Sequence, residues 1–202
     1  MESYSQLNQD IKVINFYNNK NYGYFVEIGA NDGLLLSNTY LLEKNYNWKG
    51  ICIEPLPDKF IELKNNRPNS ICIDKAIYNE TGLILDFSVH ELGSGITDNI
   101  DCYLHNKNSP QIKVETSLLN DILIQCNAPL FIEYLSIDTE GTEYEILKTI
   151  DYNKYIFGII HIEHNYIEPK RKMIKDLLLS NGYIYLGENQ WDDEYIHSSL
   201  KE

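Results

Sequence analysis

Two acidic strand ends and a glycine loop give this chain the residue types that hold a nucleoside. An apolar run at 25–28 leads into Gly29-x-x-x-Gly33, and a second apolar run at 51–53 ends in Glu54. Strand, glycine loop, helix, strand and acid is the order in which an open α/β sheet binds a nucleoside. Ionised Glu54 offers two oxygens that can accept hydrogen bonds from both ribose hydroxyls. The plainer interpretation is that the glycines only shape a tight turn.

The content of the glycine loop indicates which nucleoside to expect. A dinucleotide site requires Gly-x-Gly-x-x-Gly, with a helix N-terminus directed at the pyrophosphate. Here Asn31 and Asp32 lie between the two glycines, and Asp32 is a poor neighbour for a phosphate. S-adenosylmethionine has a ribose and an adenine, carries a sulfonium and an ammonium, and has no phosphate. We therefore expect S-adenosylmethionine as the cofactor.

Acidic residues follow every parallel strand that the sequence predicts. They are Glu27, Glu54, Asp74, Asp138, Glu140 and Glu163, the last followed by His164. In a parallel sheet these positions meet at one edge, above which the ligand lies. Any one of them is explained equally well by helix capping or by contact with water. Together they predict a site that binds a cation, because packed carboxylates repel one another.

The elements that position these acids alternate along the chain. Residues 1–20 contain a helix with Leu7, Ile11, Ile14 and Tyr17 on the face that covers the sheet. Parallel strands are expected at 24–28, 50–54, 71–73, 131–137 and 157–162, a further strand at 83–89, a loop or flap at 91–109, and an antiparallel pair at 183–186 and 194–197. Helices are expected after Ser37, from Pro57, after a Ser117 N-cap, after a Thr142–Glu145 capping box, and from Pro169 to a Gly182 C-cap.

This alternation, with no linker between its parts, predicts an α/β fold. Residues 1–202 are expected to form a single doubly wound, Rossmann-like domain, with a mostly parallel sheet and an antiparallel C-terminal strand pair. The length of 202 residues suits one hydrophobic core. The bias toward Asn, Ile, Lys and Tyr indicates an AT-rich genome and carries no functional information.

Composition disfavours several classes of partner. The net charge of −13, without a basic stripe, argues against nucleic acid as a substrate. We expect no membrane span and no signal peptide, because no apolar run approaches about 20 residues and the N-terminus is polar. The four cysteines form no Cys-x-x-Cys pair, so zinc is not expected. We expect a reducing, cytoplasmic location instead.

Two other kinds of chemistry fit the sequence poorly. No serine occupies a Gly-x-Ser-x-Gly elbow and no cysteine lies beside a histidine in the sequence, which disfavours a covalent nucleophile. Methylation of a base nitrogen in nucleic acid would place an Asn/Asp-Pro-Pro-aromatic run after the strand at 131–137. The chain has Asp138-Thr139-Glu140-Gly141 there instead.

Three segments resemble the FkbM-type S-adenosylmethionine-dependent methyltransferases. They are 25–33, 51–55 and 135–143, and the last is the most specific because it contains Asp138-Thr139-Glu140-Gly141-Thr142-Glu143. Ser5-Gln6-x-x-Gln9-Asp10, Ser37-Asn38-Thr39 and 162–165 fit the same family. The resemblance implies an O-methyltransferase acting on hydroxyls of sugars, glycolipids or polyketide-derived compounds. Residues 90–112 match nothing in the family, and we expect substrate identity to depend on them.

The family pattern also implies roles for individual residues. It assigns Glu27, Gly29, Asn31, Gly33, Ser37, Asn38 and Glu54 to the cofactor, with Asp74 or the backbone at Ala76 facing the adenine. Asp138 is the first candidate for the base that removes the hydroxyl proton, and Glu140, Glu163 and His164 are the others. A Mg²⁺ ion held by Asp138, Glu140 and Glu163 is the alternative, which the sequence leaves open.

The predicted function is therefore O-methylation of a sugar, either a nucleotide sugar or a glycan. Two other functions compete with it: a scaffold protein that keeps the fold without turnover, and a nicotinamide-dependent sugar dehydrogenase, which the Gly29-x-x-x-Gly33 spacing disfavours. The oligomeric state stays open, with a homo-oligomer as one alternative.

Overall fold

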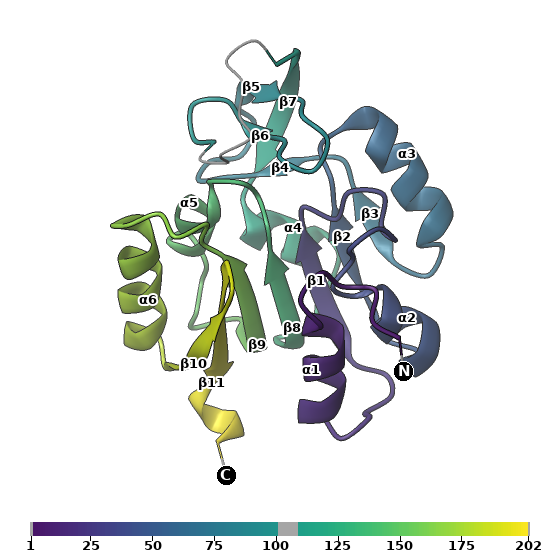
Figure 1. Ribbon diagram of the computed structural model, residues 1–202, viewed down its shortest axis with the longest axis vertical. Helices are drawn as coiled ribbons and strands as arrows, with labels where there is room; N and C mark the ends of the chain where they lie inside the picture. The colour runs from purple at the N-terminus through teal and green to yellow at the C-terminus, as the bar shows by residue number, and fades with distance from the viewer. Residues whose placement is uncertain (1, 101–108, 202) are drawn as a thin grey trace.

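A seven-stranded sheet forms the centre of the fold in the computed structural model, which describes residues 2–100 and 109–201 (Figure 1). The strand order is β10-β11-β9-β8-β1-β2-β3. The parallel strands are β1 (Tyr24–Ile28), β2 (Lys49–Ile53), β3 (Ile71–Ile73), β8 (Phe131–Ile137) and β9 (Ile156–Glu163); β10 (Tyr183–Asn189) and β11 (Asp192–His197) are antiparallel. The predicted Rossmann-like α/β class is confirmed, including the antiparallel pair at the C-terminal end.

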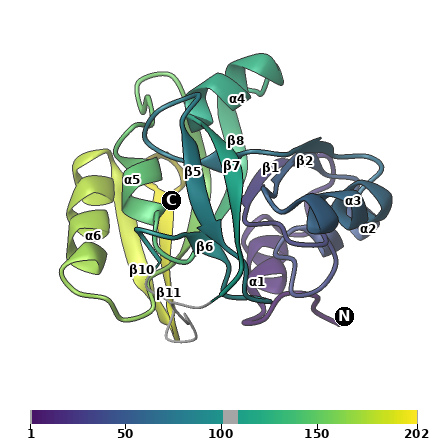
Figure 2. The same ribbon diagram turned by 90° about the horizontal axis from the view of Figure 1, so that it is seen from above.

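Helices cover both faces of this sheet (Figure 2). The helices α1 (Gln9–Phe16), α2 (Tyr40–Tyr46) and α3 (Pro57–Asn66) lie on one face, and α4 (Leu119–Gln125), α5 (Glu143–Leu147) and α6 (Lys170–Ser180) lie on the other. Alternation along each strand builds the two layers of core: Phe25 packs toward α1–α3, while Val26 packs toward α4–α6. None of the helices in the described residues is long and apolar enough to cross a bilayer.

A second, four-stranded sheet stands at the top of Figure 1, over the carboxyl edge of the first. Its order is β4-β7-β5-β6, with β4 at Ala76–Ile77, β7 at Gln111–Ser117, β5 at Ile84–Ser88 and β6 at Gly95–Ile96. Of these strands the sequence predicted only β5. The loop or flap that the sequence predicted at 91–109 contains β6. Residues 101–108 of that segment lie outside the described residues. Two-residue strands such as β4 and β6 are too short to show a period-2 pattern.

Two predicted helix caps are wrong in detail. Leu118, not Ser117, is the N-cap residue of α4, because Ser117 is still the last residue of β7. Thr142 is the N-cap residue of α5 but makes no side-chain capping bond, and Glu145 pairs with Lys148 instead of completing a capping box. Pro57 begins α3 as predicted, and Gly182 follows α6 with φ +86°.

Candidate active site

A cavity of about 300 Å³ opens above the carboxyl edge of the parallel strands. This volume is at the lower end of the range for small-molecule sites. Its walls come from the N-terminal segment, the strand ends and the small sheet: Gln6, Gln9, 27–31, 35–38, 53–56, 75–77, Phe87, 91–94, Ile96, Ser136, 138–140, Thr142, Glu163, Asn165, Trp191 and Asp192. The small sheet therefore closes the side of the cavity that the main sheet leaves open.

Close packing of the backbone places the glycine loop against the end of β8. Gly29 has φ +85°, and a Cβ atom at this position would lie 1.8 Å from the carbonyl oxygen of Asp138. The backbone N–H of Asp138 donates to the oxygen of Ile28 over 3.0 Å. Glycine is required at position 29 because both the backbone conformation and the contact exclude a side chain. One side of the loop thus touches Asp138, the proposed base.

Glu54 lies at the end of β2 with its carboxylate fixed by the backbone. One oxygen accepts from the N–H of Asn31 over 2.9 Å and the other from the N–H of Leu56 over 2.8 Å. The side chain borders the cavity, and each oxygen keeps a lone pair for a ligand hydroxyl. Burial raises the pKa of Glu54 to about 7, against the opposing effect of the Leu56 and Asn31 N–H groups.

This pKa predicts that a ligand whose hydroxyls donate to Glu54 binds more tightly as the pH rises from 6 to 8, and S-adenosylmethionine, the cofactor expected from the sequence, is the ligand to test. With a pKa of about 7, roughly a tenth of Glu54 is ionised at pH 6, so the dissociation constant there should be about tenfold larger than at pH 8. Calorimetry on the wild-type protein and on Glu54→Gln checks this. Glutamine cannot ionise, so the difference between the two pH profiles isolates Glu54 from the other acids of the cavity. Parallel profiles for the two proteins would remove Glu54 from the ribose site.

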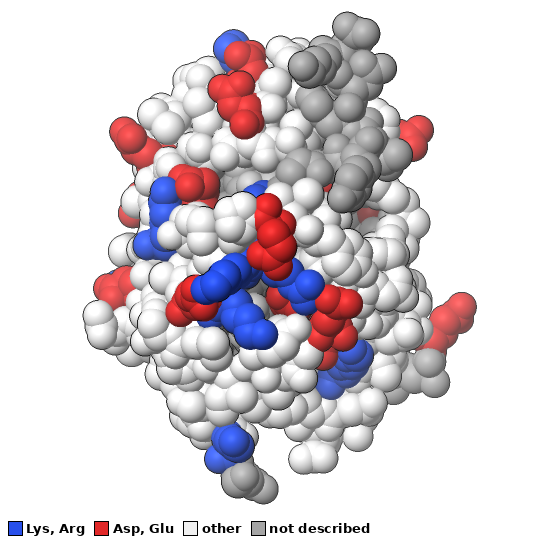
Figure 3. All heavy atoms as spheres, turned by 60° about the vertical axis from the view of Figure 1, so that its left-hand side comes forward, with Lys and Arg blue, Asp and Glu red and all other residues white. Residues whose placement is uncertain are grey.

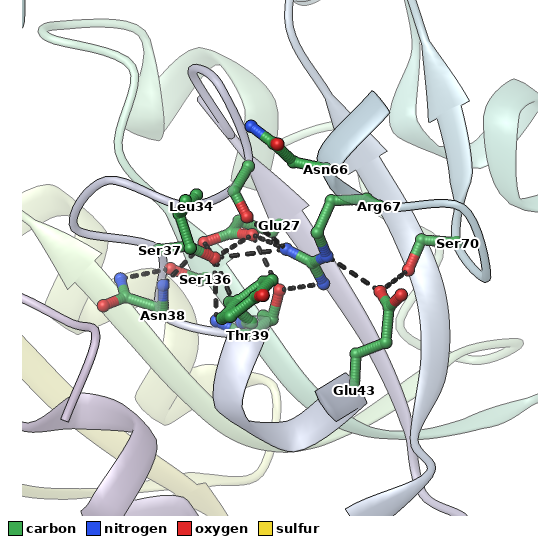
Figure 4. Close-up of polar contacts among 12 residues, drawn as sticks. Glu27, Leu34, Ser37, Asn38, Thr39, Glu43, Asn66, Arg67, Ser70 and Ser136 are labelled. Atoms are coloured by element: carbon green, nitrogen blue, oxygen red, sulfur yellow. Dashed lines mark hydrogen bonds and ion pairs between the residues drawn. The ribbon is translucent and has the colours of Figure 1, made fainter. Parts of the chain in front are cut away.

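Glu27 is held by a buried arginine that the sequence analysis missed (Figure 4). Arg67 Nη1 lies 3.3 Å from Glu27 Oε2, and Arg67 Nε lies 2.8 Å from Glu43 Oε2. The Glu27 carboxylate also accepts from the hydroxyls of Ser37 and Thr39. Glu27 borders the cavity, but these donors occupy its oxygens, so it acts by fixing the segment from Ser37 to Thr39. Its predicted direct contact with the cofactor stays a prediction.

Two asparagine oxygens in the cavity wall have no hydrogen-bond partner. They are the Oδ1 atoms of Asn31 and Asn38, both shielded from water. The Asn38 amide is oriented by its Nδ2, which donates to Ser136 Oγ over 2.8 Å. An unpaired buried acceptor is costly unless a ligand donates to it. These oxygens therefore suit the hydroxyl or ammonium donors of a bound molecule.

Asp138, Glu140 and Glu163 come together in the cavity wall beside the glycine loop. Carboxylate oxygens of all three lie within 4.8 Å of one another. Asp138 is exposed at the cavity surface, yet the protein around it raises its pKa above the usual range, and the negative charges of Glu140 and Asp192 raise it further. The pKa of Glu163 is raised by burial and then by Asp138. The three residues that the sequence grouped as base or metal ligands are thus neighbours.

The structure separates the predicted site residues into two groups. Those that border the cavity are Glu27, Gly29, Asn31, Ser37, Asn38, Glu54, Ala76, Asp138, Glu140 and Glu163. Gly33, Asp74 and His164 do not border it. Asp74 is exposed, and Gly33 is needed for the turn, with φ +75°. The buried His164 points to its own neighbours, since its Nδ1 accepts from the N–H of Tyr166.

Gln9 and Asp192 are cavity residues to which the sequence analysis assigned no role. Gln9 Nε2 donates to Asp192 Oδ2 over 2.7 Å, which joins the N-terminal segment to β11. The neighbouring Asp10 orders that segment by accepting from Ser3 Oγ over 2.6 Å and from the N–H of Tyr4 over 2.8 Å. The Ser5-Gln6-x-x-Gln9-Asp10 pattern was the available signal for Gln9. Nothing marked Asp192, which lies inside a short polar run.

The fold is Rossmann-like, and solved structures of methyltransferases share it. The N-terminal domain of human METTL16 is similar, with a TM-score of 0.53 and 12% identity over 98% of this chain and 72% of that chain. A precorrin-6y C5,15-methyltransferase from Geobacter metallireducens has a TM-score of 0.50 and 10% identity over 93% of this chain and 85% of that chain. At such identities the likeness shows the fold alone.

The family model described as "Methyltransferase FkbM domain" matches residues 27–185. The chain therefore belongs to the FkbM methyltransferase family, which implies S-adenosylmethionine as the methyl donor. No curated protein matches the chain.

Proposed function

We propose that this protein transfers a methyl group from S-adenosylmethionine to a hydroxyl of a sugar. The observation that carries the proposal is the position of Asp138, whose backbone packs on the glycine loop while its carboxylate borders the same cavity. A methyl acceptor that is a hydroxyl must lose a proton, and a positioned carboxylate can take it. The nicotinamide-dependent dehydrogenase is set aside because the chain belongs to a methyltransferase family.

The residues at the glycine-loop end fit the cofactor. Glu54 would accept from the ribose hydroxyls, the Oδ1 atoms of Asn31 and Asn38 would accept from the ammonium, and the backbone at Ala76 would border the adenine. When bound, S-adenosylmethionine supplies a methyl group already activated on a sulfonium. The protein then has to align the acceptor, which can supply roughly 7–11 kcal/mol of the barrier, and Asp138 has to remove the proton as the oxygen attacks.

Charge supports a small acceptor over a nucleic acid. On the face that carries α6, basic and acidic side chains are mixed (Figure 3). Arg171 there pairs with Glu188 and Asp193, and Lys172 pairs with Asp176. Paired bases are poorly available for phosphates. The thiols of Cys52, Cys72 and Cys126 are free, which supports the cytoplasm as the compartment that we propose.

A panel of acceptors tests the proposal directly. Labelled S-adenosylmethionine is incubated with nucleotide sugars, free and alkyl-linked sugars, and a short RNA as a negative control. We expect label on a sugar, and an O-methyl signal by nuclear magnetic resonance. Label on nitrogen or carbon would contradict hydroxyl methylation, and failure to bind S-adenosylmethionine by calorimetry would favour the scaffold alternative. Loss of activity in EDTA with recovery in Mg²⁺ would assign Asp138, Glu140 and Glu163 to a metal ion instead.

A further inference from the structure

Two carboxylates face each other across strands β9 and β11 at the end of the cavity. Glu163 is the direct partner of Asp192 in the antiparallel register. Both border the cavity, yet they are only 9% and 6% exposed. Like charges directly opposite each other on a sheet are destabilising. Two such groups at one buried position either keep a proton, in line with the raised pKa of each, or bind a positive charge that enters the cavity.

Among the described residues, no lysine or arginine forms an ion pair with Glu163 or Asp192; Lys12, whose charge lowers the pKa of Asp192, pairs with Glu194. Glu163 Oε2 has no hydrogen-bond partner, and Asp192 Oδ2 receives only the neutral amide of Gln9 among the hydrogen bonds of the described residues. Lys75 is the one lysine or arginine in the described wall of the cavity, and its Nζ pairs with Glu115. Lys170 donates to the oxygen of Gly141, and its Nζ lies 3.7 Å from Glu143 Oε2. A ligand that carries a positive charge would therefore provide the partner that the described residues do not give to Glu163.

The spacing of the carboxylates suits an ammonium group. Oxygens of Asp138, Glu140 and Glu163 lie within 4.8 Å of one another. An ammonium donates three hydrogen bonds of about 2.8 Å in tetrahedral directions, so its acceptors stand about 4.6 Å apart. Mg²⁺ binds oxygens at about 2.0–2.1 Å, so its ligand atoms stand at most about 4.2 Å apart, and the upper limit of 4.8 Å is compatible with either ion. The cross-strand pair adds a further carboxylate, Asp192, beside Glu163.

Glu163 and Asp192 lie away from the glycine loop, where we expect the cofactor. The glycine loop follows β1, whereas β9 and β11 lie two and three strands away in the order β11-β9-β8-β1. At about 4.8 Å per strand, Glu163 and Asp192 stand roughly 10 and 14 Å along the edge from that loop. Asp138, at the end of β8, lies between the two ends. A ligand here would lie on the acceptor side of Asp138.

We propose that Glu163 and Asp192 bind a protonated amine of the methyl acceptor, which is therefore an amino sugar or a similar amino alcohol. This rests on the proposed function, because it assumes that the acceptor presents its hydroxyl to Asp138. The same acids disfavour a nucleotide sugar, since its diphosphate would enter a wall of carboxylates with Lys75 as the nearest lysine or arginine in the described lining.

Calorimetry with S-adenosylhomocysteine present tests the inference without requiring turnover. The probes are methyl glycosides of 2-, 3-, 4- and 6-amino-deoxyhexoses, each beside its hydroxyl parent and its N-acetyl form. We expect at least one amine to bind tenfold or more tightly than both matched neutral forms. Glu163→Gln and Asp192→Asn should each remove this preference. Glu188→Gln is the control, because Glu188 is an exposed acid on β10 outside the cavity.

Three results would overturn the inference. If the amino glycosides and their neutral forms bind equally well, or if none of them binds, an amine is not what the site recognises. Weaker S-adenosylmethionine binding in Glu163→Gln or Asp192→Asn would show that the acids serve the ammonium of the cofactor. Protein-bound Mn²⁺ seen by paramagnetic resonance, and lost in Glu163→Gln, would assign them to a metal. Selective amine binding without methyl transfer to any hydroxyl would contradict the proposed function alone.

Discussion

Replacing Asp138 by asparagine should lower the rate of methyl transfer by roughly 10²–10⁴-fold, which is the usual contribution of a positioned base. Asparagine keeps the shape of the side chain and the backbone contact with Gly29, so the affinity for S-adenosylmethionine should change little. The pKa of Asp138 is raised above its usual range by the surrounding protein and by Glu140, which makes its carboxylate a stronger base when it is ionised. The measurement is the turnover number of both proteins with saturating cofactor and acceptor.

A second carboxylate variant controls for the loss of one negative charge. Glu145 lies on α5 and pairs with Lys148, outside the cavity wall, so Glu145→Gln should keep the wild-type rate. The acid limb of the pH–rate profile should also disappear in Asp138→Asn. Wild-type turnover in Asp138→Asn, with no effect of EDTA, would move the catalytic role to Glu140 or Glu163.

The sequence predicted the parallel core because short apolar runs with acids at their ends are a local signal. The runs at 24–28, 71–73 and 131–137 became strands within a residue of their predicted limits. The acids at the ends of β1, β2, β8 and β9 reached one cavity because parallel strands share a carboxyl edge. His164 did not, because it lies one residue beyond Glu163, where the chain turns and its backbone N–H bonds to Trp191.

The features that sequence reasoning missed depend on contacts between distant segments. Asp192 is notable because it lies opposite Glu163, and Arg67 is notable because it forms an ion pair with Glu27. Neither contact is visible as a spacing pattern in the sequence. The small sheet was missed because β4 and β6 have two residues each. These strands are formed by pairing with β7 and β5, not by local preference.

Replacing Arg67 by methionine should lower the free energy of unfolding by roughly 3–5 kcal/mol, because it leaves buried carboxylates without their partner. Arg67 has no exposed surface, and the side chains of Glu27 and Glu43 are 5% and 7% exposed. Its guanidinium also donates to Thr39 Oγ1 over 2.8 Å and lies over the ring of Phe25. Lysine cannot reproduce this planar set of donors, so Arg67→Lys should be destabilising as well.

Chemical denaturation at pH 7.5 measures this loss of stability, and two further variants serve as controls. Lys113→Met breaks an exposed pair with Asp86 and should change stability by about 1 kcal/mol or less. Adding Glu43→Gln to Arg67→Met removes one of the buried charges and should recover part of the loss. Because Glu27 fixes the Ser37–Thr39 segment of the cavity wall, Arg67→Met should also bind S-adenosylmethionine more weakly. If Arg67→Met lowers the free energy of unfolding no more than Lys113→Met does, water reaches Glu27 and Glu43. Arg67 then does not hold the Ser37–Thr39 segment in place.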